Sequence, residues 1–310
     1  MRPKLLWSAL ALLLILSFLP ALAPDWWFAD LCSHFRVQAG AAGAAAALAF
    51  ALSRQTAATL AAAAIIVINV TALWPAAGQA QVAAGRPRAL RVAFANVYYR
   101  NPHTDRVARF ALESGADVVV LAEITPAWNA ALADLERHFP YRHYAYLEGQ
   151  RRAGTLLLSR LPLESATTLS FGRGGDPGVS AEVRVGTKLV HLIGVHPTWP
   201  LWRAATQRRN AQYARIAALA RAAGGDTIVV GDFNATPFSP AYARFVAASG
   251  LMDASNGRGW MPTWPTFFPP FGLEIDHALV SRDLYVVQFE RGPRVGSDHL
   301  PIVLDLATPL

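Results

Sequence analysis

Residues 227–234 have the sequence TIVVGDFN, in which four residues that favour β-strands run directly into polar side chains. Every second side chain of an extended strand lies on the same face, so Asp232 and Asn234 converge on one point. A carboxylate beside a carboxamide is suited to orient a water molecule or to bind a phosphate oxygen. A lone Asn at a strand end is usually a turn residue, so the interpretation depends on what the other strands carry.

The same arrangement recurs in both directions along the chain. Polar residues end or follow apolar runs in RVAFAN (Asn96), DVVVLAE (Glu123), LVHLIGVH (His196), LEIDHALV (Asp276) and GSDHLPIVL (Asp298 and His299). Each residue alone has an ordinary explanation, because a lone His on a strand is usually a core residue and a Glu often begins a helix. Their shared position at strand ends, where α/β proteins present catalytic groups, predicts one common site.

The region from Leu90 onward alternates between strand and helix patterns. Short apolar runs predict strands at 90–95, 117–121, 154–159, 180–185, 188–195, 227–230, 275–280 and 300–306. Helical patterns cover 104–114, 126–138 and 201–223. Gly186-Thr187, between two strand patterns, predicts a tight hairpin.

The N-terminal quarter of the chain has a different composition. Apolar runs at 5–23, 37–52 and 57–74 contain no charged residue, and about 20 apolar residues cross a bilayer core, so we predict three transmembrane helices. One alternative is a cleaved signal peptide, since Arg2 and Lys4 precede the first run and Ala21-Leu22-Ala23 ends it. The other is a buried helical hairpin of a soluble domain. The two further uncharged runs favour the membrane over both alternatives.

Positive residues set the predicted orientation. Arg2, Lys4 and Arg54 place the N-terminus and the turn 53–56 in the cytoplasm. Three crossings then carry the rest of the chain to the extracytoplasmic face of the cell (inner or plasma) membrane. We therefore predict a multi-pass anchor over 1–75, a linker over 76–89 and a catalytic domain over 90–310.

Overall composition excludes several classes of protein. The 310 residues are 53% hydrophobic and 16% charged, which is incompatible with a disordered or collagen-like chain. Cys32 is the only cysteine, so a disulfide scaffold is excluded. The net charge of +7 suits an anionic partner but does not choose between nucleic acid and a lipid headgroup.

In their order along the chain, FAN, LAE, VHP, GDFN, EIDHAL and GSDHLPI resemble the motifs of the endonuclease/exonuclease/phosphatase superfamily of metal-dependent phosphodiesterases. The resemblance covers residues 90–306, and GDFN together with GSDHLPI is its most specific part. It implies a four-layer α/β sandwich, with two packed, mostly antiparallel sheets flanked by helices. In this chain a bundle of about three transmembrane helices would precede the sandwich.

The resemblance also implies a metal site. Glu123 would hold Mg²⁺ or Mn²⁺ with Asn96 beside it, and Asp298 would be a further ligand of the metal or its water. Ligation by oxygen atoms with retained water is what Mg²⁺ prefers. In abasic-site endonucleases an acidic residue follows the first Asn, whereas here Val97-Tyr98-Tyr99 follow. This departure argues against a second metal position and against that nuclease subclass.

The remaining motif residues would be catalytic. By the resemblance, Asp276 orients His299, which contacts the scissile phosphate, and Asp232 acts on the attacking water or the leaving oxygen. Asn234 and His196 would bind phosphoryl oxygens. A carboxylate behind an imidazole fixes its tautomer, as in other His–Asp pairs.

The family gives the reaction but not the substrate. A domain anchored at the membrane meets lipid continually. The segment WMPTWPTFFPPF (260–271), with Trp199 and Trp202, has the aromatic content that a rim for an acyl or prenyl chain would need. The ordinary alternative for this segment is a rigid loop packed on the fold. We expect a lipid-linked phosphodiester or phosphate ester as substrate, the bilayer as a partner, and no protein partner.

Two other functions are considered. An extracytoplasmic nuclease, endonuclease or exonuclease, would use the basic residues Arg151, Arg152, Arg203, Arg208 and Arg209 to bind nucleic acid if they line one groove. A non-catalytic binding module is disfavoured, because every motif keeps its acidic, amide or imidazole residue.

Overall fold

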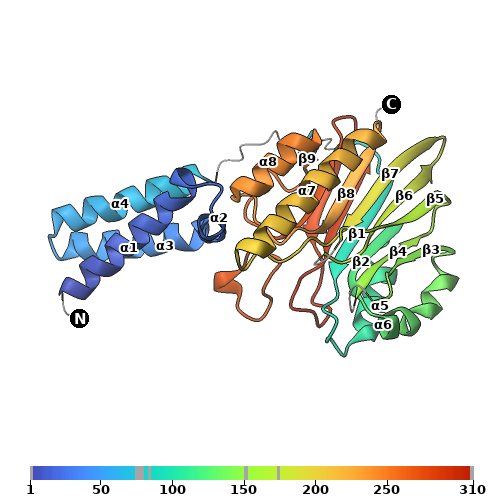
Figure 1. Cartoon of the computed structure of the whole chain (residues 1–310), viewed down its shortest axis with the longest axis horizontal. Coiled ribbons are helices and arrows are strands. Elements are labelled where there is room, and N and C mark those ends of the chain that lie inside the picture. The colour runs from blue at the N-terminus through green and yellow to red at the C-terminus, as the bar shows by residue number, and fades with distance from the viewer. Residues whose placement is uncertain (1–2, 74–79, 83–84, 150–152, 173–174, 308–310) are drawn as a thin grey trace.

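The computed structural model describes residues 3–73, 80–82, 85–149, 153–172 and 175–307. An elongated group of N-terminal helices lies beside a larger α/β sandwich, and the two are joined at one end of the helices (Figure 1). The linker predicted at 76–89 is described only in part. Trp74, Arg151 and Arg152 lie outside the described residues.

Two six-stranded sheets form the sandwich. The first contains, in spatial order, β11 (Tyr285–Arg291), β12 (Ile302–Ala307), β1 (Leu90–Asn96), β2 (Val118–Ile124), β4 (Gly154–Ser159) and β3 (Tyr141–Ala145). The second contains β5 (Leu163–Leu169), β6 (Gly178–Val185), β7 (Lys188–Val195), β8 (Thr227–Asp232), β10 (Asp276–Val280) and β9 (Met252–Asp253). Both are mixed, since β1–β2 and β7–β8 pair in parallel and the other named pairs are antiparallel.

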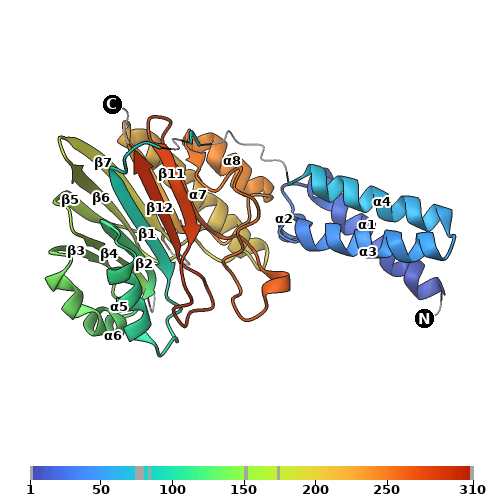
Figure 2. The same ribbon diagram turned by 180° about the vertical axis from the view of Figure 1, so that it is seen from behind.

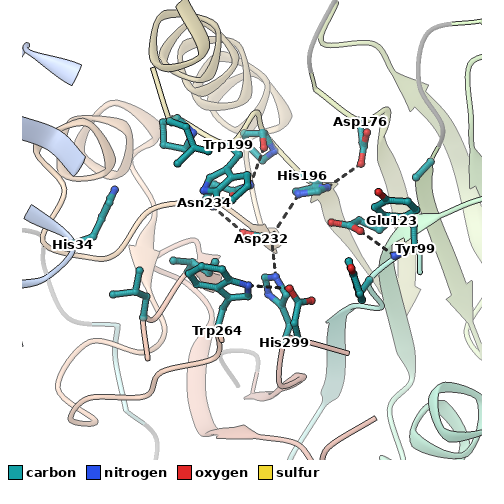
Figure 3. Close-up of a pocket in the computed structure, with 18 of the residues that line it drawn as sticks. His34, Tyr99, Glu123, Asp176, His196, Trp199, Asp232, Asn234, Trp264 and His299 are labelled. Atoms are coloured by element: carbon teal, nitrogen blue, oxygen red, sulfur yellow. Dashed lines mark hydrogen bonds and ion pairs between the residues drawn. The ribbon is translucent and has the colours of Figure 1, made fainter. Parts of the chain in front are cut away.

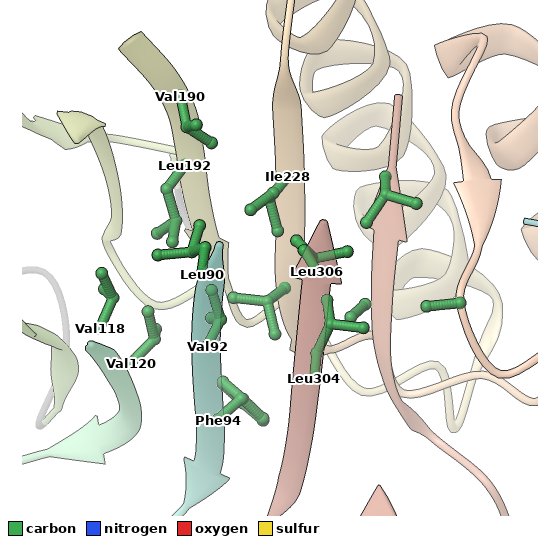
Figure 4. Packing of buried hydrophobic residues seen from close by; sticks show 14 of the residues in the cluster. Leu90, Val92, Phe94, Val118, Val120, Val190, Leu192, Ile228, Leu304 and Leu306 are labelled. Atoms are coloured by element: carbon green, nitrogen blue, oxygen red, sulfur yellow. The ribbon is translucent and has the colours of Figure 1, made fainter. Parts of the chain in front are cut away.

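Three apolar cores separate four layers (Figure 2). Between the sheets, residues of β1 and β12 such as Phe94 and Leu304 pack with Leu192 of β7 and Ile228 of β8 (Figure 4). The outer face of the first sheet packs on α5 (Thr104–Glu113) and α6 (Pro126–Ala131). The outer face of the second packs on α7 (Arg203–Ala223) and α8 (Pro240–Ser249). The predicted α/β sandwich of two flanked sheets is confirmed.

The eight predicted strands all form, and the Gly186-Thr187 hairpin joins β6 to β7 with Gly186 at φ +61°. The prediction of one helix over 126–138 is wrong. Helix α6 ends at Ala131 and a 3₁₀ helix covers Ala133–Arg137, which turns Leu132 and Leu135 inward together with Trp128. The helix predicted at 201–223 begins at Arg203, because Trp202 is extended.

Each of the three apolar N-terminal runs is helical, as α1 (Pro3–Leu22), α3 (Arg36–Leu52) and α4 (Thr56–Thr71). Helices α3 and α4 pack closely, since a Cβ atom on Gly43 would lie 2.9 Å from Cγ2 of Ile65. A fourth helix, α2 (Trp27–Ser33), was not predicted and occupies the loop between the first two runs.

Within the described part of the chain, no single helix combines the length and the apolar character needed to cross a bilayer. Both requirements are satisfied only by a bent pair, which consists of residues Leu6–Leu22 of α1 and helix α2. The chain bends by 113° between the two helices.

Candidate active site

Asp232 is the centre of the site and lies at the end of β8. Antiparallel pairing with β10 places Asp276 directly opposite Asp232, and parallel pairing with β7 brings the loop after Val195 alongside. Asp232 is 1% exposed, and its Oδ1 accepts the backbone N–H of Asn234 at 2.9 Å. The second oxygen of Asp232 faces groups from three other strands or loops.

Asn96 of the other sheet links Asp232 to Glu123. Asn96 Nδ2 donates to Glu123 Oε1 at 3.1 Å and to Asp232 Oδ2 at 3.0 Å. Glu123 adopts φ +63° where the pairing of β2 with β4 is interrupted, an unfavourable conformation for a residue with a Cβ. Its Oε2 accepts the N–H of Tyr99 at 3.0 Å. Such strain at a strand end is typical of functional sites.

His299 and Asp276 form a buried pair. Nδ1 of His299 lies 2.9 Å from Oδ2 of Asp276, and Nε2 of His299 lies 3.7 Å from Asp232 Oδ2. Ser297 fixes the loop, because its hydroxyl donates to the carbonyl of Asn96 and accepts the N–H of His299. The arrangement matches the dyad that the sequence predicts.

His196 approaches Asp232 from the opposite side. Its Nε2 lies 3.4 Å from Asp232 Oδ2, and its Nδ1 lies 2.9 Å from Oδ2 of Asp176. Asp176 was missed by sequence reasoning, because GGDPG has the composition of a turn. Both imidazoles therefore share Asp232 and each has a carboxylate behind it.

Asn234 and Asp298 complete the set. Asn234 adopts φ +52° and donates from Nδ2 to the carbonyl of Pro197 at 3.0 Å. Asp298 Oδ2 accepts the indole N–H of Trp264 at 3.0 Å, while its Oδ1 is buried with no partner among the described residues.

These residues surround a cavity of about 1020 Å³ (Figure 3). Six of the predicted site residues line it, namely Glu123, His196, Asp232, Asn234, Asp298 and His299. Asn96 and Asp276 lie behind them and hold Glu123, Asp232 and His299 in place. The structure thus brings all eight together.

Burial and charge shift the titration of the site. Burial alone would lower the pKa of His196, but Asp176, Asp232 and Glu123 raise it to about 9. The pKa of His299 is raised to about 10 against the same burial effect, mainly by Asp276 and Asp232. Burial raises the pKa of Asp232, although both imidazoles oppose this. Without a cation, the two imidazoles offset the negative charge of the carboxylates.

The donor set fits a divalent cation. One atom each of Asp232, Asp276 and His299 lie within 4.8 Å of one another, and Asp276 Oδ1 is buried without a partner among the described residues. Glu123 and Asp298 add two further carboxylates to the lining of the cavity. The amide nitrogen of Asn96, rather than its oxygen, faces Glu123, so Asn96 positions this carboxylate. Carboxylate oxygens at a wet cavity suit Mg²⁺ or Mn²⁺.

The arginines named for nucleic-acid binding do not line the cavity where they are described. Arg209 is fully buried and its Nη2 lies 2.7 Å from Asp30 of α2. Arg203 and Arg208 are exposed on α7. Arg209 therefore does not share a nucleic-acid-binding groove with Arg203 and Arg208.

Sequence reasoning also missed one whole wall of the cavity. Leu31, His34 and Phe35 of the N-terminal region line it together with Trp199 and Trp264. In Figure 3, His34 lies on the opposite side of the cavity from Glu123. No local pattern marks these three residues, because their role depends on how α2 packs against the sandwich.

Comparisons with known proteins agree with this geometry. Residues 93–299 match the model of the Endonuclease/Exonuclease/phosphatase family. A search of curated protein sequences found no match.

Three solved structures show the same fold. An endonuclease/exonuclease/phosphatase from Beutenbergia cavernae is 20% identical with a TM-score of 0.63, covering 72% of each chain. A Bacteroides vulgatus protein described by the same words is 18% identical, with a TM-score of 0.60 over 71% of this chain and 99% of its own. D. rerio TDP2, complexed with a single-strand DNA product, is 18% identical, with a TM-score of 0.59 over the same shares. At these identities the likeness concerns the fold alone.

Proposed function

The chain belongs to the endonuclease/exonuclease/phosphatase family of hydrolases acting on phosphoric ester bonds, and from this premise we propose that it is a membrane-anchored, divalent-metal-dependent phosphoesterase. Its substrate is a lipid-linked phosphodiester or phosphate ester on the extracytoplasmic face. The observation that carries the proposal is that two different parts of the chain line the cavity. Catalytic side chains form one part, and α2, which joins the apolar helices α1 and α3, forms another.

The residues of the chain can perform the hydrolysis in the following roles. Asp232, fixed between two imidazoles, orients the attacking water or serves the leaving oxygen. His299, held by Asp276, and His196, held by Asp176, donate to phosphoryl oxygens on which charge develops. The amide of Asn234 is a further polar group at the same end of the cavity.

Glu123 would hold the cation, with the free oxygen of Asp298 as a further ligand. The compact group Asp232, Asp276 and His299 is the alternative position. At either position a divalent cation would neutralise charge on the phosphoryl oxygens.

The surface of the N-terminal helices supports the membrane part of the proposal. Large apolar side chains point outward along them, among them Ile15 (60% exposed), Leu48 (63%), Leu60 (66%) and Val67 (60%). Exposure of this apolar surface to water would be unfavourable, whereas a bilayer would cover it.

The aromatic segment 260–271 supports a lipid substrate. Its side chains Phe267 (73% exposed), Phe268 (50%) and Phe271 (49%) point outward rather than into a core. The segment lies on the side of the sandwich that faces the N-terminal helices (Figure 1), and Gln38 of α3 donates to the carbonyl of Gly272 at 3.0 Å. Exposed phenyl groups beside the apolar helices would enter the same bilayer that covers those helices.

A nuclease is the second candidate, because TDP2 of D. rerio has the same fold and its structure holds a single-strand DNA product. Against it, the lining of the cavity contains no arginine or lysine among the described residues. Binding of a polyanion through several phosphates needs such side chains.

The test is an assay of the purified full chain with Mg²⁺, Mn²⁺ or EDTA. Long-chain alkyl phosphates, polyprenyl phosphates, phospholipids and single-stranded DNA are offered at equal phosphoester concentration. We expect metal-dependent hydrolysis of a lipid phosphoester and little cleavage of DNA. Preferential cleavage of DNA, weakening steeply with salt, would establish the nuclease instead.

A further inference from the structure

Helix α2 is fastened to the sandwich by buried polar contacts. Asp30, 3% exposed, accepts from Arg209 Nη2 at 2.7 Å and from the hydroxyl of Ser239 at 2.5 Å. His34 Nδ1 lies 3.2 Å from the backbone N of Thr236 and 3.1 Å from its hydroxyl. Contacts of this kind hold one orientation, because separating them would leave buried charges and donors unpaired. The end of α2 is therefore a fixed part of the catalytic cavity.

Two apolar side chains at this end face the cavity. Leu31 and Phe35 line it, and Phe35, immediately before α3, remains 37% exposed. Leu273 and Ile275 add apolar surface from the sandwich, and Trp199 (54% exposed) lines the cavity from the loop after β7. The catalytic acids and imidazoles thus share one cavity with an apolar wall that contains no charged group of α2.

We infer that Leu31 and Phe35 form the binding wall for the apolar chain of the substrate, next to the reacting phosphate. The inference rests on the proposed function and deepens it, because it assigns the N-terminal helices a part in substrate recognition as well as anchoring. A chain on this wall covers the exposed part of Phe35 and continues toward α3, whose outward side chains Leu48 (63% exposed) and Leu52 (77%) are also apolar. A free inorganic phosphate gains nothing from the wall.

The experiment measures how affinity depends on chain length. Butyl, hexyl and octyl phosphate compete with labelled inorganic phosphate for the full chain in nanodiscs with Mg²⁺. Each buried methylene strengthens binding by up to about fourfold, so we expect octyl phosphate to bind wild type at least ~10-fold more tightly than butyl phosphate. Leu31→Ser with Phe35→Ser should reduce this octyl-to-butyl ratio to about 2 or less. Partitioning into the nanodisc concentrates the longer chains equally for wild type and variant, so the difference between their octyl-to-butyl ratios reports the wall.

Two further variants separate recognition from folding. Phe18→Ser removes a phenyl group of similar exposure (41%) from α1, away from the cavity, and should keep the wild-type ratio. Phe35→Leu keeps an apolar side chain and should keep most of it. A wild-type ratio near 1 would overturn the lipid substrate and this inference with it. A normal wild-type ratio that the double Ser variant retains would overturn only the role of the α2 wall.

Discussion

At the scale of single residues, the site is organised around one carboxylate. Asp232 Oδ2 lies 3.4 Å from His196 and 3.7 Å from His299, so the two imidazoles are linked through it. Binding of a separate phosphoryl oxygen, the role that the resemblance implies for His196, would leave this residue nearly independent of the His299–Asp276 pair. Because both imidazoles lie beside one oxygen of Asp232, we instead predict that substitutions at His196 and His299 affect the rate non-additively.

A double-mutant cycle tests this coupling. Asp276→Asn and His299→Ala should each lower kcat by at least ~100-fold, and the double variant should be little worse than His299→Ala, because residues acting as one unit are non-additive. The coupling energy between His196→Ala and His299→Ala should exceed ~1 kcal/mol, because both imidazoles lie beside the same oxygen of Asp232. The coupling energy between His196→Ala and Asp276→Asn should be smaller, because residues that share a partner couple most strongly. Rates are measured at saturating Mg²⁺. Full additivity of Asp276 and His299 would contradict the 2.9 Å contact.

The position of the cation is tested by binding as well as by activity. Glu123→Gln removes a charge from a strained site, so we expect kcat to fall at least ~100-fold while the protein stays folded. Mn²⁺ at 100 times its Kd should stabilise wild type by about 2.7 kcal/mol and the variant by much less. Thermal unfolding with and without Mn²⁺ gives the answer. Equal stabilisation of Glu123→Gln and wild type, with loss in Asp276→Asn, would place the cation at the alternative group.

Sequence reasoning anticipated which polar side chains meet at the cavity more completely than it anticipated the apolar walls. The eight predicted residues were found because strand ends and motif order mark them. Asp176 was missed, because a carboxylate in a Gly/Pro turn is indistinguishable from a surface residue. Leu31 and Phe35 were missed because only the docking of α2 brings them to the cavity.

At the scale of elements, the strands that sequence reasoning missed are those at the sheet edges. The eight predicted strands are the interior ones, whereas β3, β5, β9 and β11 are the outermost strands of the two sheets. The interior strands β8 and β12 are buried at every residue, whereas the edge strand β5 (LESATTL) has no buried residue. Polar and charged residues on edges prevent aggregation and also remove the hydrophobic pattern on which prediction depends.

The docking of α2 should depend on pH through His34. Burial lowers the pKa of His34 from 6.5 to about 4; the nearby Asp30 opposes this and Arg209 adds to it. Below pH 6.5 the unfolded chain takes up a proton that the folded chain refuses until about pH 4. The neutral imidazole therefore contributes about 3 kcal/mol of stability above pH 6.5, and this is lost as the pH falls toward 4.

His34→Asn is the matched control, because its side-chain oxygen can still accept the N–H of Thr236 but does not titrate. The unfolding temperatures of wild type and His34→Asn in detergent are measured from pH 7.5 to 4. We expect the wild-type curve to fall more steeply between pH 6.5 and 4. Parallel curves would mean that His34 is accessible to protons in the folded protein.

At the scale of the whole molecule, the contacts of α2 constrain the topology. Because Asp30 and His34 bind the sandwich directly, the loop 24–36 and the catalytic domain must lie on the same side of any membrane. Helices α3 and α4 lead away from that side and back, so the turn 53–56 lies at their far end (Figure 2). In the topology predicted from the sequence, this far end carries the positive residues Arg2, Lys4 and Arg54. Positive residues favour the cytoplasm, so this topology places the far end there.

The last prediction follows from this geometry. A reporter enzyme that is active only after export should be active when fused after Leu310 and inactive when inserted in the turn Ser53–Thr56. Reversing the charge bias with Arg54→Glu and Lys4→Glu should reduce the activity of the C-terminal fusion, because orientation depends on those charges. The matched control Arg282→Glu changes an exposed arginine of the sandwich, and it should leave the topology unchanged. If both wild-type fusions are expressed but inactive, both fusion points lie in the cytoplasm and α4 (Thr56–Thr71) does not cross the membrane, and the extracytoplasmic lipid substrate would then be excluded.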